Sequence, residues 1–173
     1  MYINQLSQQF SVRLLQPRDA HQIYEIGLGN PQFFLYGSAD LSPEHLWDEL
    51  QEIPPDKTAE DKYVIGYFEG STMVAFVDLL VSYPDEDSAY IGFFMVNAAY
   101  SGKGIGSSLI SQLKEELRKD GLMRVELAYL EGNEQSRAFW TKCGFTPFGQ
   151  LVEIAQGTVV RMQCRLEDPS RTE

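Results

Sequence analysis

The spacing of hydrophobic residues along the chain alternates between strand-like and helical patterns. Runs of alternating or β-branched residues predict strands at residues 10–15, 62–69, 72–83 and 89–96. Gly70-Ser71 and the polar turn at residues 84–87 separate the last three runs, which is typical of an antiparallel meander. Proline and serine at helix-start positions predict two earlier helices, at residues 17–28 and 42–53, and a polar linker at 54–61.

Helical spacing returns after residue 104, where Ile105, Leu109, Leu113 and Leu117 form one apolar stripe. Gly121 is expected to end this helix. The pattern then predicts a strand at residues 124–130, a short helix at 135–143, and two strands near 147–154 and 158–166. This order of elements predicts an α+β fold, with a mixed, mostly antiparallel sheet of about seven strands and helices on both faces.

The composition is that of one globular domain. The chain has 173 residues, of which 43% are hydrophobic and 23% are charged, and we expect a single domain over residues 1–173. Its core would cover about residues 12–166, followed by a polar, frayed tail at 167–173. No apolar run reaches a membrane-spanning length and the first residues lack a signal-peptide pattern, so a cytoplasmic location is expected. Cys143 and Cys164 are expected to be reduced and buried, and their spacing suggests no metal site.

The formal net charge of -11 limits the partners that the chain would attract. Nucleic acid and anionic membrane surfaces would repel it at long range, whereas a cationic amine would be attracted. The alternative is that the acidity serves solubility alone. The sequence is compatible with a homodimer but does not specify one.

The segment SGKGIGS, residues 101–107, carries most of the information about chemistry. Glycines at positions 102, 104 and 106 leave backbone N–H groups free to converge on a phosphate at a helix N-terminus, where the helix dipole adds attraction. Lys103 and the Ser107 hydroxyl can contribute further contacts. A tight turn without a ligand is the alternative. The spacing fits neither the dinucleotide fingerprint nor the nucleotide P-loop, so those enzyme classes are disfavoured.

Strand, glycine loop and helix together resemble the acetyl-CoA pyrophosphate site of the GNAT superfamily of N-acetyltransferases. The family pattern has Gln or Arg, then Gly three positions later, then Gly or Ala two positions after that; here these positions hold Ser101, Gly104 and Gly106. Serine in place of Gln or Arg leaves the backbone cradle intact. A second block, residues 133–145, resembles another motif of the family at Asn133, Ser136, Trp140, Lys142, Gly144 and Phe145. The likeness extends over about residues 12–166 and is strongest at 95–145.

The resemblance implies an enzyme with acetyl-CoA as cosubstrate and no metal, acting on an amine. The implied cofactor-binding residues are Met95, Val96, Ser101, Gly102, Lys103, Gly104, Ile105, Gly106, Ser107, Asn133, Ser136, Trp140 and Lys142. In the family, the asparagine at the position of Asn133 lies near the pantetheine arm, where that arm passes between two splayed strands. Asn133 could also cap a helix, and the two roles are compatible. Phe139 and Phe145 are expected in the core.

The resemblance also assigns catalytic roles. Backbone N–H groups on the strand before the glycine loop hold the thioester carbonyl, which implicates Met95 and Val96 here. Many members have a tyrosine at the position of Trp140, where it protonates the leaving thiolate; tryptophan can donate its indole N–H but cannot transfer that proton. A thiol with a pKa of about 8.5 is already a tolerable leaving group. Tyr129 and Tyr90 are candidate substitutes for the missing acid.

The sequence leaves the identity of the general base undetermined as well. A glutamate that is frequent in the family four residues before Val96 is Gly92 here. Asp78 lies in the apolar run MVAFVDLLV, where burial would raise the pKa of its carboxyl, so it is a candidate base or amine anchor. A structural or edge-exposed Asp78 is the alternative, and an amine deprotonated through water needs no dedicated base. His21 and His45 lie in the first two predicted helices, where surface or packing roles are expected rather than catalysis.

The acceptor pocket, by analogy with the family, would be roofed by the loop at residues 30–37, whose three aromatic residues could stack on a substrate or pack in the lid. The sequence therefore predicts transfer of acetyl to the primary amine of a small cationic acceptor, by direct attack on the thioester. Because Trp140 and Gly92 replace residues that are frequent in the family, a catalytically weak acyl-CoA-binding or sensor protein is the alternative. A pure interaction domain without a CoA site is a further one.

Overall fold

The computed structural model describes residues 1–30 and 42–166, so the predicted acceptor loop and the tail at 167–173 lie largely or wholly outside the described residues. The strands are β1 (Ser11–Leu14), β2 (Lys62–Glu69), β3 (Thr72–Val81), β4 (Ser88–Val96), β5 (Arg124–Leu130), β6 (Thr146–Pro147), β7 (Val152–Ile154) and β8 (Gly157–Arg165). The α-helices are α1 (Ala20–Leu28), α3 (Pro43–Leu50), α4 (Ile105–Lys119) and α5 (Glu134–Lys142). Short 3-10 turns lie at Ile3–Gln5, Pro17–Asp19, Ala59–Asp61 and Ala98–Tyr100.

The predicted α+β plan is confirmed, with one sheet of eight strands in the order β1-β2-β3-β4-β5-β8-β6 and β7 paired to β8. Strands β2, β3 and β4 form the expected antiparallel meander, and β4 pairs with β5 in parallel. The expected single strand at residues 147–154 is instead two short strands. Pro147 has no N–H for a longer ladder, and Gly149 has a φ of +68°, so the chain turns away after β6.

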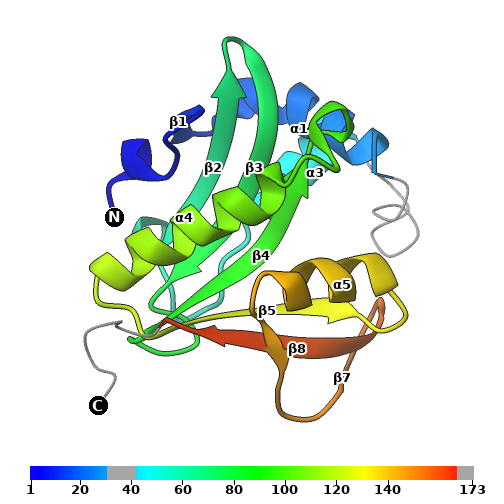
Figure 1. Ribbon diagram of the computed structural model, residues 1–173. Helices are drawn as coiled ribbons and strands as arrows, with labels where there is room; N and C mark the ends of the chain where they lie inside the picture. Colours follow the sequence, from blue (N-terminus) through cyan, green and yellow to red (C-terminus); the bar gives the residue numbers. More distant parts are fainter. Residues whose placement is uncertain (31–41, 167–173) are drawn as a thin grey trace.

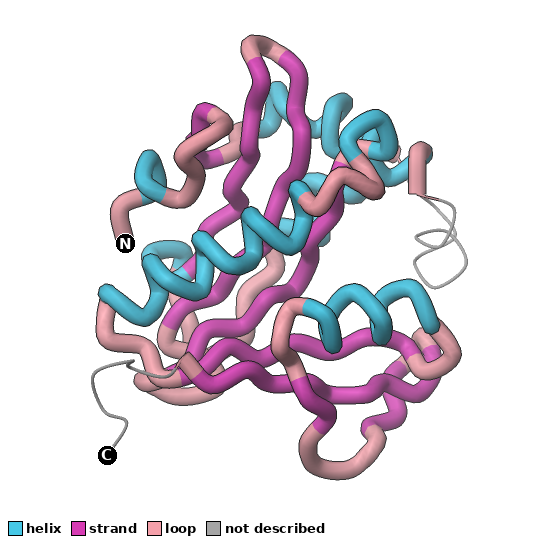
Figure 2. Tube along the Cα trace, viewed as in Figure 1, coloured by secondary structure: helices cyan, strands magenta, loops and turns pink. Residues whose placement is uncertain are grey.

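Helices cover both faces of the sheet (Figures 1 and 2). The apolar stripe of α4 packs on one face, where Leu109, Leu113 and Leu117 are 1% exposed or less and join the main core. On the other face, α1 and α3 bring Ile23 and Leu46 into a second core with residues of β2 and β3. Among the described residues, no helix is long and apolar enough to cross a bilayer.

The sheet opens at the middle of β4. Strand β4 pairs with β5 only between Ser88–Ile91 and Arg124–Leu127, so the later halves of the two strands part from each other. The same place carries a β-bulge, because Asp78 of β3 is paired with Phe93 while Leu79 is paired with Ile91, which leaves Gly92 as the extra residue. A bulge bends its strand and increases the local twist, so it accounts for the divergence of β4 from β5.

The Asp78 side chain fills the space that a side chain at Gly92 would need. A Cβ built on Gly92 would lie 2.6 Å from Asp78 Oδ2. Asp78 is 7% exposed, so its carboxylate has little room to withdraw. A side chain at position 92 would therefore force Asp78 to shift, and we expect the two positions to be energetically coupled.

This coupling gives a first prediction. Gly92→Ala should lower the free energy of unfolding by about 1–3 kcal/mol, because the added methyl group overlaps the buried carboxylate. In the background of Asp78→Ala, the same change should cost much less, because the obstructing oxygen is absent. Urea unfolding of the four proteins in this cycle measures the coupling energy. Strictly additive costs would show that Asp78 is not what excludes a side chain from position 92.

Candidate active site

The glycine loop has the backbone conformation that its sequence suggests. Gly102 and Gly104 have φ angles of +75° and +76°, which favour glycine, and nothing lies within 4 Å of a Cβ built on either. Gly106 is glycine for a different reason, since its Cβ would lie 3.2 Å from Val96 and from Phe139. The loop is therefore open to the solvent at its tip and closely packed at its base.

The N-terminus of α4, directly after this loop, has backbone N–H groups without a partner inside the helix. Gly104 is its N-cap and supplies no side-chain cap, and the first helical bond runs from Ser108 N–H to the Gly104 carbonyl at 3.1 Å. The amides of residues 105–107 therefore have no partner within the helix, and the helix dipole makes this end positive. The Lys103 ammonium lies beside the loop, 3.1 Å from the Ala99 carbonyl.

A cavity of about 360 Å³ lies against these amides and is called the phosphate cavity here. It is bounded by the glycine loop, the start of α4, the end of β4 and the outer side of α5. Among the predicted residues it brings together Met95, Val96, Ser101, Gly102, Gly104, Ile105, Gly106, Ser107, Ser136, Trp140 and Lys142. Lys103 does not line the cavity, although its neighbours in sequence, Gly102 and Gly104, do.

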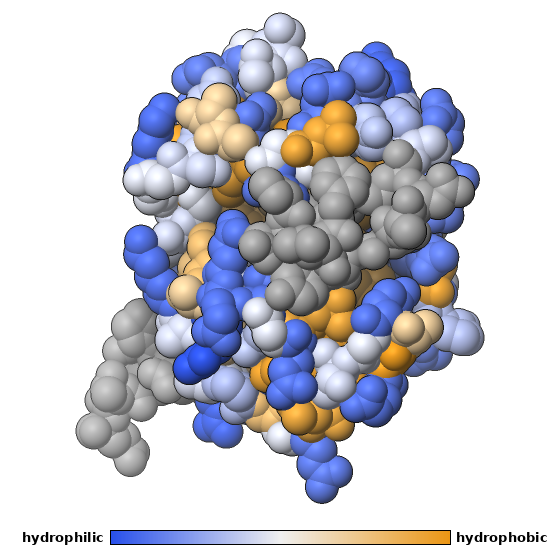
Figure 3. Space-filling view, turned by 90° about the vertical axis from the view of Figure 1, so that its right-hand side faces the viewer, coloured by the Kyte–Doolittle hydropathy of each residue, from blue (hydrophilic) through white to orange (hydrophobic). Residues whose placement is uncertain are grey.

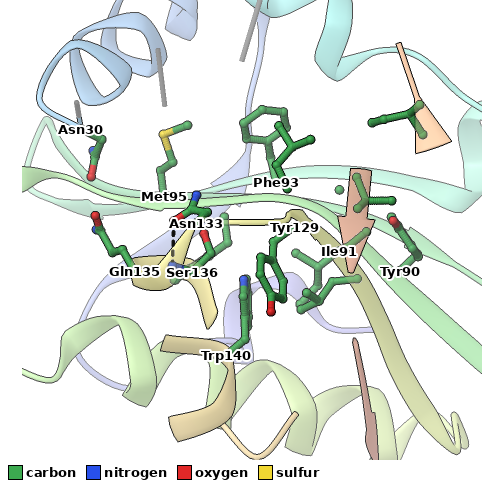
Figure 4. Close-up of a pocket in the computed structure, with 17 residues that line it drawn as sticks. Asn30, Tyr90, Ile91, Phe93, Met95, Tyr129, Asn133, Gln135, Ser136 and Trp140 are labelled. Atoms are coloured by element: carbon green, nitrogen blue, oxygen red, sulfur yellow. Dashed lines mark hydrogen bonds between the residues drawn. The ribbon is translucent and has the colours of Figure 1, made fainter. Parts of the chain in front are cut away.

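The gap between β4 and β5 forms a second cavity, of about 390 Å³, called the central cavity. Figure 4 shows Phe93 and Met95 on one side of β4, and Tyr129 and Trp140 on the side of α5. Asn133 lies at its edge and accepts a hydrogen bond from the Ser136 N–H at 3.0 Å, the dashed line in the figure. The predicted helix-cap role of Asn133 is thus confirmed, and the residue also lines the cavity.

The direction of the β4 amides follows from its hydrogen bonds. The Asn97 N–H bonds to β3 at 2.8 Å. Because bonding alternates along an antiparallel strand, the Met95 N–H also faces β3, whereas the N–H groups of Phe94 and Val96 face the gap. Asn30 Nδ2 donates to the Val96 carbonyl at 3.3 Å, which agrees with this direction. The amides of Phe94 and Val96 are therefore the donors available to a group in the central cavity.

Trp140 is held in an aromatic cluster under both cavities. It is 7% exposed, and its ring centroid lies 4.9 Å from that of Phe139, 5.2 Å from Phe145 and 6.0 Å from Phe94. Phe145 is fully buried as predicted, whereas Phe139 is only partly buried and stacks on Phe94. Trp140 therefore forms a rigid apolar wall of the site.

A third cavity, of about 500 Å³, lies on the α1 and α3 face of the sheet and is called the carboxylate chamber. More ionisable residues line it than line either of the other two cavities. Asp78 lines it. The Lys62 ammonium lies 2.7 Å from Asp78 Oδ1, but without the angle of a hydrogen bond, and this oxygen has no hydrogen-bond partner among the described residues. Burial raises the pKa of the Asp78 carboxyl and the charge of Lys62 opposes the rise, as its position in an apolar strand predicts.

Ionisable residues from five neighbouring strands line the floor of the chamber. Lys62 on β2, Asp78 on β3, Tyr90 on β4, Glu126 on β5 and Arg161 on β8 all line it, and these five strands are neighbours in that order. The pattern places two carboxylates around a central phenol, with a cation at each end. Burial raises the pKa of Tyr90, the negative charges of Glu126 and Asp78 raise it further, and Arg161 opposes them.

Both carboxylate oxygens of Glu126 accept hydrogen bonds, whereas Asp78 Oδ1 accepts none from the described residues. Glu126 is 4% exposed and lies 2.9 Å from Arg124 Nε and 3.4 Å from an Arg161 nitrogen. Sequence reasoning missed Glu126, although a glutamate inside the apolar strand RVELAYL is the same kind of signal as Asp78. It also missed Lys62 and Arg161, which are unremarkable in sequence because only the sheet register brings them to the chamber.

The three cavities are contiguous because they share walls. Met95, Ser136 and Trp140 line both the phosphate and the central cavity, while Tyr90 and Gly92 line both the central cavity and the chamber. Figure 3 shows the molecule from the side, where patches of hydrophobic surface lie among polar residues. His21 and His45 lie on the surfaces of α1 and α3, each near a glutamate one turn later.

A helix N-terminus with free backbone amides, joined to a gap between two strands, leaves room for a long ligand that carries phosphate groups. The acetyltransferase (GNAT) family matches residues 23–145, and the chain belongs to that family. The family consists of acetyltransferases and uses acyl-CoA, so the protein is an enzyme of this class. No curated protein matches the chain significantly.

Solved structures agree on the fold. An acetyltransferase from Thermus thermophilus superimposes with a TM-score of 0.66 at 19% identity, covering 90% of this chain and 96% of that one. The ribosomal-protein-S18-alanine N-acetyltransferase from Escherichia coli gives 0.64 at 18% identity, covering 94% and 97%. The structure of AAC(6')-Ib in complex with paromomycin and acetyl-CoA gives 0.70 at 19% identity, covering 94% and 96%.

The glycine loop gives a second prediction. Gly104→Val should weaken acetyl-CoA binding at least tenfold, because a β-branched side chain at positive φ both strains the loop and screens the free amides. Gly121→Val is the matched control: Gly121 also has a positive φ, +91°, with open space at its Cβ, but lies past the far end of α4. Isothermal titration calorimetry measures affinity, and thermal unfolding shows whether both variants fold. Equal affinity in the two folded variants would contradict the assignment of the loop.

Proposed function

We propose that this enzyme transfers an acetyl group from acetyl-CoA to the primary amine of a small cationic acceptor, by direct attack of the amine on the thioester. One observation carries the proposal: a row of three contiguous cavities leads from free helix amides, through the gap in the sheet, to a chamber with two buried carboxylates. The order of these cavities matches the order of groups that the reaction must hold, from phosphates through thioester to amine.

The phosphate cavity supports the binding of acetyl-CoA. Its donors are the unpaired amides at the start of α4, and Gly102 and Gly104 leave the approach to them open. Lys142 lines this cavity and Lys103 lies near it, so both can add positive charge. The gap between β4 and β5 is the path by which the pantetheine arm would pass, with Asn133 and Ser136 beside it.

When bound, acetyl-CoA supplies the thioester on which the amine acts. The Val96 and Phe94 amides are fixed donors for its carbonyl oxygen, and a preorganised donor of this kind stabilises the transition state by a few kcal/mol, roughly 3. Trp140 shapes the site but cannot transfer its indole proton. Tyr129 lines the same cavity and carries a hydroxyl that could protonate the leaving thiolate.

Asp78 is the proposed anchor of the amine and acceptor of its proton. Its Oδ2 lies beneath Gly92, which lines both the central cavity and the chamber. A carboxylate there attracts an ammonium group, and its raised pKa makes it a better proton acceptor than an ordinary aspartate.

A calorimetric titration with acetyl-CoA, followed by thiol-release assays with polyamines, amino acids, aminoglycosides and peptides, tests the proposal. Binding with transfer to a cationic amine is the expected result. Binding of acetyl-CoA without transfer to any amine would favour an acyl-CoA sensor. The absence of acetyl-CoA binding would refute the proposal as a whole.

A third prediction concerns Trp140. Trp140→Tyr should keep or raise kcat, because tyrosine preserves an aromatic wall and adds a transferable proton. Trp140→Ala should weaken acetyl-CoA binding by about tenfold through lost packing. Trp47 on α3 packs in the second core, away from the cavities, so Trp47→Ala controls for general loss of an aromatic residue. An inactive Trp140→Tyr variant that still folds and binds CoA would contradict this role.

A fourth prediction concerns the charge of the acceptor. With a net charge of -11, the protein should attract a cationic amine at long range, so kcat/KM should fall about threefold or more between roughly 0.05 and 0.5 M salt. Activity should rise with pH, since Asp78 must be ionised above its raised pKa and the amine must lose a proton to attack. Initial rates for the best amine, measured across salt and pH, provide the test. A rate indifferent to salt, or a best acceptor that is neutral or anionic, would overturn the cationic acceptor.

A further inference from the structure

The Asp78 carboxylate is buried yet has spare capacity for hydrogen bonds. An ionised carboxylate can accept about four. Asp78 is 7% exposed, Oδ1 has no hydrogen-bond partner among the described residues, and Oδ2 lies in the space left open by Gly92. A buried polar atom in this condition is costly unless some group arrives to pair with it. Oδ1 therefore has an unused acceptor position, which a donor could reach only where the Lys62 ammonium now lies.

The charge partner of Asp78 has a second partner within the chamber. The Lys62 ammonium is 2.7 Å from Oδ1 without hydrogen-bond geometry, whereas it donates a proper hydrogen bond to the Glu52 carbonyl at 3.0 Å. The Glu52 carbonyl is thus a partner that the Lys62 ammonium could keep if another cation took its place at Asp78. A buried carboxylate cannot lose its cation without a replacement, so the incoming group must itself be cationic.

Lys62 also shows what kind of ligand the chamber accepts. It places a primary ammonium, carried on an unbranched alkyl stem, inside the chamber and beside the carboxylate. A free primary amine in its protonated form has the same head group. A quaternary ammonium has the charge but no N–H, so it could not satisfy the carboxylate.

We propose that the acceptor is an unbranched primary alkylamine whose ammonium takes the place of the Lys62 ammonium at Asp78, so that Lys62 is an exchangeable counter-ion that sets acceptor affinity. This inference rests on the proposed function and names the acceptor class and the residue that limits its binding. Lys62 acts through Asp78 and is a positioning residue. In the free enzyme it neutralises Asp78; in the complex the acceptor does.

The other ionisable groups around Asp78 fit this exchange. Tyr90 faces it from β4, Glu126 from β5 and Arg161 from β8, and Glu52 lies at the chamber edge after α3. Glu126 is occupied by its two arginines, so it offers no second place for an ammonium. Asp78 is therefore the carboxylate of this floor that is available to a ligand.

The test measures binding of n-butylammonium to the CoA-loaded protein by calorimetry at pH 8, where both the carboxylate and the amine are charged. Lys62→Met removes the competing charge and should tighten binding about tenfold relative to the wild type. Lys62→Arg should weaken binding, because a guanidinium fork holds a carboxylate more firmly than an ammonium does. Asp78→Asn should reduce binding at least tenfold in either background.

Two control ligands separate charge exchange from a change in shape. Tetramethylammonium has no N–H and 1-butanol has no charge, so Lys62→Met should change their binding little. The gain in Lys62→Met should shrink as the pH is lowered, because burial unopposed by Lys62 raises the pKa of Asp78 and a protonated carboxyl no longer attracts a cation. Acetyl-CoA affinity and thermal unfolding show whether each variant is folded.

Equal affinity for n-butylammonium in the wild type, Lys62→Met and Lys62→Arg proteins would overturn the exchange. Unchanged affinity in Asp78→Asn would overturn the place of binding. Neither result depends on acetyl transfer, so failure of this inference is distinct from failure of the proposed function, which would appear as a lack of acetyl-CoA binding.

Discussion

The parting of β4 from β5 after Ile91 and Leu127 is the constraint on which the site depends. Two parallel strands that remained paired would use their backbone groups on each other and leave no gap. The bulge at Gly92 bends β4 at the point where pairing stops, and the N–H groups of Phe94 and Val96 then face an open space. An interrupted ladder thus supplies both a gap between the strands and free backbone donors along it, which are the two features that the proposed path of the cosubstrate uses.

One glycine and one aspartate link this interruption to the acceptor side. Gly92 has no side chain, and Asp78 from the neighbouring strand occupies the space. A carboxylate can therefore reach the boundary between the central cavity and the chamber from β3, even though β4 carries no acidic residue there. The same contact disfavours a side chain at position 92, so in our proposal folding and acceptor binding depend on the same pair of residues.

The electrostatics of the molecule act at two scales. The overall charge of -11 produces a long-range field that favours cations and is screened by salt. Within the chamber the charges are nearly balanced, because Lys62 and Arg161 accompany Asp78 and Glu126. The two carboxylates differ in their hydrogen bonds: both Glu126 oxygens accept one, whereas Asp78 Oδ1 accepts none from the described residues.

The sequence by itself determined the fold class, the order of elements and the glycine loop, because these depend on periodicity and on local backbone chemistry. Gly102 and Gly104 have positive φ, and α4 follows the apolar stripe of Ile105 and Leu109, all of which short-range rules can read.

Only the tertiary structure decided how the chamber is assembled. Lys62, Glu126 and Arg161 lie on three strands far apart in sequence, and strand register alone places them around Asp78. The broken strand at residues 146–154 and the direction of the β4 amides likewise follow from pairing with β8 and β3. A one-residue change in register would turn each of these groups to the opposite face, and a single sequence carries no local signal that fixes it.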